Sequence, residues 1–254
     1  MLYITLLLFV VGTFFGSFYA CISTRLSKNE SIIRPGSHCE NCNHRLTWYE
    51  LIPVFSYLIQ GGKCRKCKIK LSKGYLLSEL LTGVLFALSF YIYGFSYNTL
   101  IMIVLSSMLV SIYVSDFKYL VILDEILIPS MIILIVLLFI KYNYMFVLNS
   151  VIRGLVLFII LLIIKLVGDK VFKQESLGWG DVKLSFIAGL LLGFKLGLVY
   201  LFLGAFIALP YGIYLRVSKK DLLMPFGPFL ITSMWIVYVC SPYIRIILKV
   251  LIGV

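Results

Sequence analysis

Five acidic residues stand out because they lie at or near the ends of long apolar segments, where charged groups are costly and suggest function. They are Glu79, Asp116, Asp124, Glu125 and Asp181. An acid at a helix N-terminus interacts favourably with the helix dipole, so Asp124 and Glu125 are explained as the start of a helix. Asp116 lies at the C-terminal end of its apolar segment, where the dipole disfavours an anion. It therefore needs another explanation.

Asp181 stands in the stretch SLGWGDVKL, residues 176–184, between two apolar segments. Gly178 and Gly180 remove side chains beside its carboxylate, which allows another backbone to approach closely. Two aspartates brought together from distant segments can share one proton, so that one acts as a base on water and the other as an acid toward a carbonyl. We therefore interpret this stretch as half of an aspartic protease site.

Four of the six cysteines form two CxxC pairs, Cys39 with Cys42 and Cys64 with Cys67, separated by 21 residues of one polar segment. Each pair can direct two thiolates at one ion, and together they complete a closed tetrahedral zinc shell. Nearby Lys and Arg residues offset the thiolate charge. Because a four-sulfur shell has no open position, we expect a structural zinc site with the neighbouring residues His38 and His44 outside the shell. A pair of redox dithiols or disulfides is the alternative, which a reducing cytoplasm disfavours.

Membrane helices must position these groups. The chain is 61% hydrophobic and only 13% charged, against about 25% charged in ordinary soluble domains; its mean hydropathy is +1.04. Its apolar runs predict an all-α polytopic membrane protein with about eight transmembrane helices. The predicted spans are 2–23, 75–93, 99–115, 125–140, 146–165, 182–194, 196–215 and 226–248. The sixth and seventh also fit one broken element, and the first lacks the features of a cleaved signal peptide.

The basic residues indicate the orientation of the chain. Residues 24–74 contain ten Lys or Arg, and the segments expected on the same side raise the total to eighteen, against five on the other. This bias predicts that residues 24–74 are cytoplasmic and that both termini lie outside. The net charge of +12 is thereby explained without nucleic acid. The predicted domains are a first transmembrane helix (1–23), a cytoplasmic zinc-binding domain (24–74) and a transmembrane domain (75–254).

Taken together, these motifs resemble the type IV prepilin leader peptidases, which are G-x-G-D membrane aspartic proteases. The similarity spans nearly the whole chain, through GSF at 16–18, RPGSHCENCNHRLTWYELIPVFSYLIQGGKCRKC at 34–67, KGYLLSELLTG at 73–83, SDFKYLVILDE at 115–125, GWGDVKL at 178–184 and PFGPFL at 225–230. In that family the first catalytic aspartate stands eight residues before the aspartate of a Pro-Asp pair, and the second ends G-x-G-D. The resemblance therefore implies Asp116 and Asp181 as the catalytic pair. Leu123 stands where the family has the proline.

The resemblance further implies a bifunctional enzyme of the bacterial cytoplasmic membrane. Its substrates would be type IV prepilins or pseudopilins, cleaved on the cytoplasmic side after a basic leader and then methylated on the new N-terminal amine. The resemblance ties residues 24–74 to the methyltransferase activity, and S-adenosylmethionine as methyl donor rests on it alone. Glu79 is a candidate contact for the substrate N-terminus. Lys183 is expected to meet lipid head groups, with orientation of a carboxylate as the alternative.

Two other classes of protein compete with this interpretation. Acids within a membrane also serve proton relays, so an ion-coupled transporter is one alternative. The acids here gather near one interface and not at the midplane, which disfavours it. The second alternative is a zinc-binding scaffold protein with no enzymatic activity. Such a protein would not need a G-x-G-D motif together with a second aspartate. The sequence leaves open which pilins are served and the oligomeric state.

Overall fold

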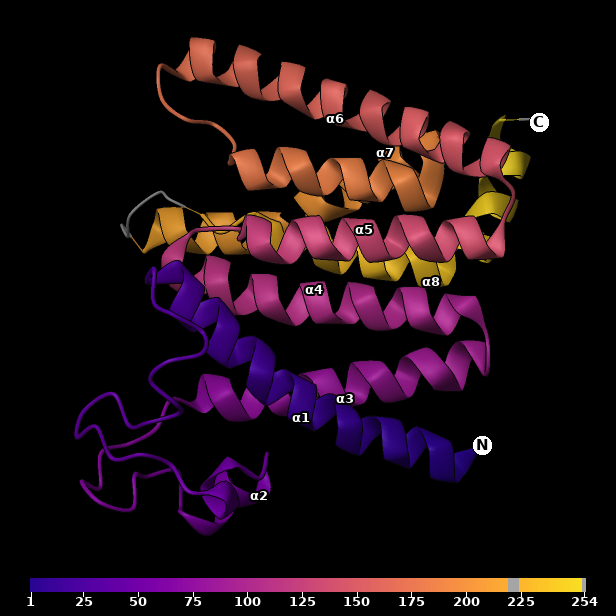
Figure 1. Cartoon of the computed structure of the whole chain (residues 1–254). Helices are drawn as coiled ribbons and strands as arrows, with labels where there is room; N and C mark the ends of the chain where they lie inside the picture. Colours follow the sequence, from indigo (N-terminus) through magenta and orange to yellow (C-terminus); the bar gives the residue numbers. More distant parts are fainter. Residues whose placement is uncertain (219–223, 253–254) are drawn as a thin grey trace. The chain divides into compact units, whose positions relative to one another are not determined.

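The computed structural model describes residues 1–218 and 224–252 (Figure 1). Lys219 and Lys220, which contributed to the orientation count, lie outside these residues. The described chain is nearly all helical and contains no β-strand, only two isolated bridges. It divides into two compact units, residues 1–115 and residues 116–254. The predicted all-α fold is therefore confirmed.

The first unit contains α1 (Leu2–Ser27), the short helices η1 (Trp48–Leu51) and α2 (Phe55–Ile59), α3 (Lys73–Tyr93) and most of α4 (Tyr97–Tyr119). Helices α1 and α3 cross in close contact (Figure 1). A Cβ atom on Gly12 would lie 2.8 Å from the Cα atom of Gly83, and one on Gly16 would lie 2.7 Å from that of Glu79. Small residues four apart allow membrane helices to approach in this way.

The polar segment between α1 and α3 is tied to these helices at two points. The buried Arg25 guanidinium, near the end of α1, donates hydrogen bonds of 2.8 to 3.2 Å to the carbonyls of four loop residues, Ser31, Ile32, Pro35 and Gly36. The buried Glu79 carboxylate in α3 accepts a hydrogen bond of 2.8 Å from the Val54 amide. Buried charged groups are stable only with such partners, so both contacts hold the segment against the helix pair.

The second unit contains α5 (Asp124–Lys141), α6 (Tyr144–Phe172), α7 (Trp179–Val217) and α8 (Gly227–Ile252), together with the last turn of α4. Helix α7 packs against α5, α6 and α8. Figure 1 shows α6 running alongside the first part of α7. A Cβ atom on Gly189 would lie 2.6 Å from the Arg153 carbonyl oxygen, so α6 and α7 are in backbone contact. Buried apolar residues of α7 and α8 form the core around the site described below.

Helix α7 has 39 residues and would be about 58 Å long if straight, far more than the roughly 30 Å of bilayer hydrocarbon. Gly193 interrupts it with φ 76° and ψ 179°, a conformation that favours glycine. The sixth and seventh predicted spans are thus one broken helix.

Six helices of the described chain are long and apolar enough to cross a membrane: α1, α3, α4, α6, α7 and α8. Helix α5 does not meet the same criterion, because its 18 residues include Asp124, Glu125 and Lys141. The exact number of eight spans is therefore not confirmed. The chain is a multi-pass α-helical membrane protein.

Candidate functional site

Asp116 lies in the last turn of α4, and its side chain is buried. Its Oδ2 atom accepts a hydrogen bond of 3.0 Å from the amide of Gly227, the first residue of α8. The start of a helix has free amide groups, so it offers a favourable partner for a carboxylate at the unfavourable end of another helix. The anomaly of an acid at the end of α4 is explained by this contact.

Asp181 lies in the first turn of α7 and is equally buried. Its Oδ1 atom has no hydrogen-bond partner among the described residues. A Cβ atom on Gly178 would lie 3.2 Å from the Oδ2 atom, so the backbone of the preceding loop passes directly over the carboxylate. A buried oxygen without a partner is rare in folded proteins and points to a functional role.

The two aspartates face one small region around Ile122. A Cβ atom on Gly227, beside Asp116, would lie 2.6 Å from the Ile122 Cδ1 atom, and one on Gly180, beside Asp181, would lie 2.5 Å from the Ile122 Cβ atom. The carboxylates are also close enough to interact electrostatically. The structure therefore places the two acids that the sequence singled out on either side of Ile122, each beside a glycine that this side chain contacts.

Lys165 is a residue at this site whose role sequence reasoning missed, because it was counted only as a positive charge near a helix end. Its side chain is 2% exposed, and its Nζ atom donates a hydrogen bond of 2.5 Å to the Leu177 carbonyl. It also pairs with Asp169 at 3.1 Å and lies 5.3 Å from the centre of the Trp179 ring. Lys165 therefore holds the loop that carries the G-x-G-D motif.

Tyr200 was also missed, since an aromatic residue in an apolar helix gives no signal by itself. It is fully buried in α7, and its hydroxyl has no hydrogen-bond partner among the described residues. The Asp181 Oδ1 atom and the Tyr200 hydroxyl are thus two buried polar groups of α7 without a hydrogen-bond partner among the described residues.

The other three acids singled out from the sequence do not contact Asp116 or Asp181 through any hydrogen bond of the described residues, and have structural roles of their own. Asp124 and Glu125 open α5, as predicted. Both oxygens of Asp124 accept hydrogen bonds of 2.7 Å from Lys183, so this lysine orients a carboxylate, which was the alternative to the expected contact with lipid head groups. Glu79 is occupied by the Val54 amide in the first unit. Its contact explains its burial without a substrate.

The four cysteines form a separate cluster in the first unit. All four Sγ atoms lie within 4.8 Å of one another, with 3.8 Å between Cys39 and Cys67 and 3.9 Å between Cys42 and Cys64. A tetrahedron with metal–sulfur bonds of about 2.3 Å has edges of about 3.8 Å. The cluster therefore has the dimensions of a four-sulfur zinc shell, and no disulfide joins these cysteines.

The two CxxC pairs have the same backbone structure. In each, the amide of the residue after the second cysteine bonds to the carbonyl of the first: Asn43 to Cys39 at 2.9 Å, and Lys68 to Cys64 at 3.0 Å. Both of these following residues have positive φ, 53° and 59°. The repeated turn aims two sulfurs at one point, which is the geometry that a metal knuckle requires.

Two thiols of the cluster differ in acidity. The Ile69 amide lowers the pKa of the Cys67 thiol to about 6. The His44 amide lowers the pKa of Cys42, but burial and hydrogen bonds with the other three thiols raise it to about 11. The cluster excludes both histidines, as predicted. His44 instead lies 3.3 Å from Glu50. Burial alone would raise the pKa of Glu50, but hydrogen bonds from Thr47 and the contact with His44 hold that pKa below its usual value.

Comparison with known proteins gives matches to both units. The family model described as "Bacterial Peptidase A24 N-terminal domain" matches residues 10–93, and that described as "Type IV leader peptidase family" matches residues 103–213. The second match includes both aspartates, and the first includes all four clustered cysteines. No solved structure matches the chain significantly.

Several curated proteins named prepilin leader peptidase/N-methyltransferase are similar to the chain. The one from Vibrio cholerae is 32% identical over 93% of this chain and 97% of its own length. The one from Bacillus subtilis is 32% identical over 87% of this chain and 88% of its own. The one from Myxococcus xanthus is 35% identical over 74% of this chain, but that match spans only 56% of the relative.

Proposed function

Because the chain belongs to the type IV leader peptidase family, we propose that it is a membrane-embedded aspartic endopeptidase that removes the leader of type IV prepilins and pseudopilins. It then N-methylates the new N-terminal residue, with S-adenosylmethionine as donor. It works in the bacterial cytoplasmic membrane, with the cysteine segment and the aspartates on the cytoplasmic side. The names of its relatives and the excess of basic residues in the segments assigned to that side support this proposal.

The observation that supports the peptidase most is the meeting of Asp116 and Asp181, two buried carboxyls from distant helices. One carboxylate takes a proton from water as the water oxygen attacks the scissile carbonyl carbon. The other, protonated, gives its proton to the carbonyl oxygen. The C–N bond then breaks, and the departing amine takes up a proton. The absence of side chains at Gly178 and Gly180 leaves space that the Asp181 carboxylate and the Ile122 side chain occupy, so Ile122 must shift for a substrate backbone to lie over Asp181.

The cysteine cluster fits a structural role in the same proposal. Cys39, Cys42, Cys64 and Cys67 would hold one Zn²⁺, and their four sulfurs leave no open coordination position for chemistry. When bound, the ion supplies cross-linking of a segment that has little apolar core of its own. We therefore assign residues 24–74 to the methyltransferase activity, and residues 75–254 to the peptidase.

The decisive experiment is reaction of the purified protein in lipid nanodiscs with a prepilin. Mass spectrometry of the product should show loss of the leader and, with S-adenosylmethionine present, addition of one methyl group at the new N-terminus. An unchanged prepilin would refute the peptidase, and a cleaved but unmethylated product would refute only the second activity. The comparisons do not support the alternative of an ion-coupled transporter. Proton uptake by proteoliposomes, with no cleavage of prepilin, would be the result that favours it.

A further inference from the structure

The short helices η1 and α2 carry an exposed apolar surface, in the part of the first unit that was expected to be cytoplasmic. Trp48 and Ile59 are 77% and 76% exposed, and Phe55 is 66% exposed. The exposed apolar side chains of residues 48–59 are Trp48, Tyr49, Leu51, Phe55, Leu58 and Ile59. A surface of this kind on an otherwise polar segment marks a contact with a membrane or a partner.

The contact between Val54 and Glu79 fixes how deep this surface lies. Helix α3 has 21 residues and is about 31 Å long, so nearly all of it is needed to cross roughly 30 Å of hydrocarbon. Glu79 is six residues after Lys73, the first residue of α3, and therefore lies about 9 Å inside the helix. The Val54 amide donates to Glu79 at 2.8 Å, and α2 begins at the next residue. The start of α2 therefore lies below the membrane surface, and Figure 1 shows α2 level with the first turns of α3.

We propose that residues 48–59 form an interfacial anchor, whose exposed apolar side chains lie in the lipid, and that the basic stretch after it, residues 63–73, binds anionic phospholipid head groups. Interfacial segments bury their apolar face about 5–10 Å into the boundary between head groups and acyl chains, which is the depth of Val54. Trp48 and Tyr49 fit this boundary, because each ring has an apolar body and a polar edge. The bilayer thus explains why the surface is exposed.

The backbone of the interfacial anchor is compatible with lipid, because its amides around the deepest point have partners within the protein. Pro53 has no amide hydrogen, and Glu79 accepts the amide of Val54. The next amides donate to carbonyls two or four residues earlier, namely those of Phe55, Ser56 and Leu58. Backbone groups without a partner are costly in lipid, so this arrangement allows the segment to leave water.

The basic stretch has the charge that an anionic lipid requires. Its sequence, KCRKCKIKLSK, contains no acid, and its cations are Lys63, Arg65, Lys66, Lys68, Lys70 and Lys73. All of them are exposed, and none forms an ion pair with another described residue. Clusters of about 4–8 Lys or Arg residues beside a membrane attract anionic head groups. The stretch therefore favours a negatively charged lipid and repels a basic leader.

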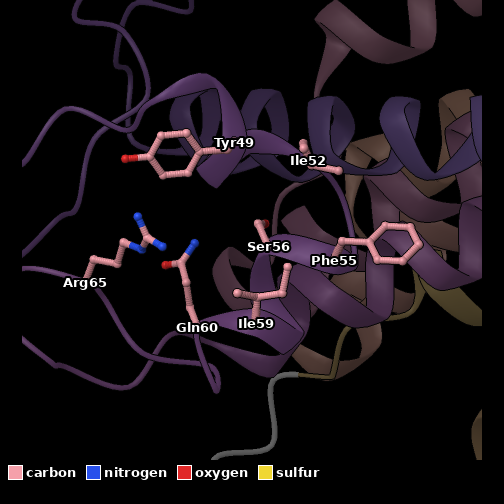
Figure 2. A pocket seen from close by; sticks show the side chains of 7 residues that line it. All are labelled: Tyr49, Ile52, Phe55, Ser56, Ile59, Gln60 and Arg65. Carbon is pink, nitrogen blue, oxygen red and sulfur yellow. The ribbon is translucent and has the colours of Figure 1, made fainter.

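A pocket of about 290 Å³ joins the interfacial anchor to the basic stretch. Figure 2 shows Arg65 and Gln60 at one end of it, and Ile52 and Phe55 at the other. A phospholipid has the same order, with a charged phosphate followed by apolar chains. The Arg65 guanidinium lies 4.9 Å from the centre of the Tyr49 ring, and its planar fork matches a phosphate. The complete lining is Tyr49, Ile52, Phe55, Ser56, Ile59, Gln60 and Arg65.

The test is quenching of tryptophan fluorescence by brominated phospholipids, in the full-length, zinc-loaded protein in nanodiscs. Trp179→Phe and Trp235→Phe leave Trp48 as the only tryptophan. The nanodiscs contain brominated phosphatidylglycerol, which is anionic, or brominated phosphatidylcholine at the same fraction. Both lipids should quench Trp48, phosphatidylglycerol more strongly, and aqueous iodide should quench it weakly. Phe55→Trp, in a chain without other tryptophans, is a second reporter next to the Val54 turn.

The preference for phosphatidylglycerol over phosphatidylcholine tests the head-group contact. Arg65→Gln should lower this preference about five-fold, the change in binding that loss of one cation near an anionic membrane produces. Lys170→Gln, an exposed lysine of α6, is the matched control and should leave the preference unchanged. Zinc content reports whether the CxxC turn is intact. If Arg65→Gln loses zinc, the double variant of Lys63→Gln and Lys70→Gln, outside that turn, replaces it.

Four results would overturn this inference. Quenching of both reporters by iodide, with none by either lipid, would place the segment in water. Protection from iodide and lipid alike would mean that a protein, such as a second copy of the chain, covers the surface. Equal quenching by the two lipids, unchanged in Arg65→Gln, would remove the anionic head group. A preference abolished by inorganic phosphate at constant ionic strength would assign the site to a soluble anion. These measurements use neither prepilin nor methyl donor, so their failure leaves the proposed function intact.

Discussion

The amide of Gly227 donates a hydrogen bond to Oδ2 of Asp116, although 111 residues separate them in the sequence. The contact joins the start of α8 to the last turn of α4 and places the PFGPFL stretch at the proposed active site. Within the second unit it fixes the orientation of one carboxylate from the backbone. Precise orientation matters because a displacement of about 1 Å can cost about 100-fold in rate.

Gly227→Ala should therefore reduce prepilin cleavage by about 100-fold. The added Cβ atom would lie 2.9 Å from Asp116 Oδ2 and 2.6 Å from Ile122 Cδ1, so the carboxylate must move. Initial rates of leader removal measure the effect. Gly212→Ala is the matched control, because its Cβ atom would lie 3.4 Å from the flexible Met224 side chain. Equal rates in the two variants would contradict the role of Gly227.

Asp116→Asn and Asp181→Asn should each abolish cleavage while the protein still inserts into the membrane. An amide can serve neither as base nor as acid, and loss of one member of a catalytic unit costs several orders of magnitude in rate. Cleavage by purified variants, with membrane extraction to verify insertion, checks this. Near-normal cleavage by either variant would remove the pair from the mechanism.

Asp124→Asn is the control for these variants and should have a mild effect. Asp124 opens α5 and pairs with Lys183, but both side chains are nearly half exposed. Exposed ion pairs contribute about 0–1 kcal/mol. A loss as large as that of Asp181→Asn would mean that Asp124, and not Asp116, is the second catalytic acid.

Lys165→Met should lower the cleavage rate by about 10- to 100-fold, because charged hydrogen bonds contribute about 1.5–3 kcal/mol. The change removes the donor that holds the Leu177 carbonyl and frees the loop before G-x-G-D. Lys170→Met, on the same helix but exposed, should be neutral. Since Lys165 is a positioning residue, Lys165→Arg, which keeps a charged N–H donor at this position, should recover part of the rate. A variant with wild-type kcat would exclude this role.

The protein should contain about one zinc ion per chain, bound by the four clustered cysteines. Elemental analysis after purification without chelator, with thiols reduced, gives the stoichiometry. Replacing Cys39 and Cys42 by serine should release the metal and loosen the segment of residues 24–74. A metal content near zero in the wild type would eliminate the zinc site.

Replacing both cysteine pairs should impair methylation more than cleavage, because Asp116 and Asp181 are held by helices of the second unit. A cleavage time course and methyl transfer to pre-cleaved pilin measure the two activities separately. Equal losses in both assays would show that the zinc-binding segment also serves the peptidase. Retained methylation with lost cleavage would reverse the division.

The sequence alone determined the class of the protein and predicted the residues of its two candidate sites. Apolar runs longer than a buried core needs indicate membrane helices, and two CxxC pairs predict the cysteine cluster that the structure contains. Asp116 was recognisable because it stands at the wrong end of a helix. These signals are local: each depends on residue types at short spacing, which the order of the chain records directly.

Only the tertiary structure decided which distant groups meet. Ile122, in the loop before α5, contacts Gly180 and Gly227, which are far from it in sequence. Lys165 reaches the Leu177 carbonyl across the turn between α6 and α7, which the sequence pattern does not reveal. A lysine in an apolar helix looks the same whether it reaches a head group or a buried carbonyl. The hydropathy pattern also could not give the number of spans. A glycine that interrupts one helix, as in α7, has the same sequence signature as a glycine between two helices. Packing selects between such alternatives, since it must satisfy every buried polar group at once.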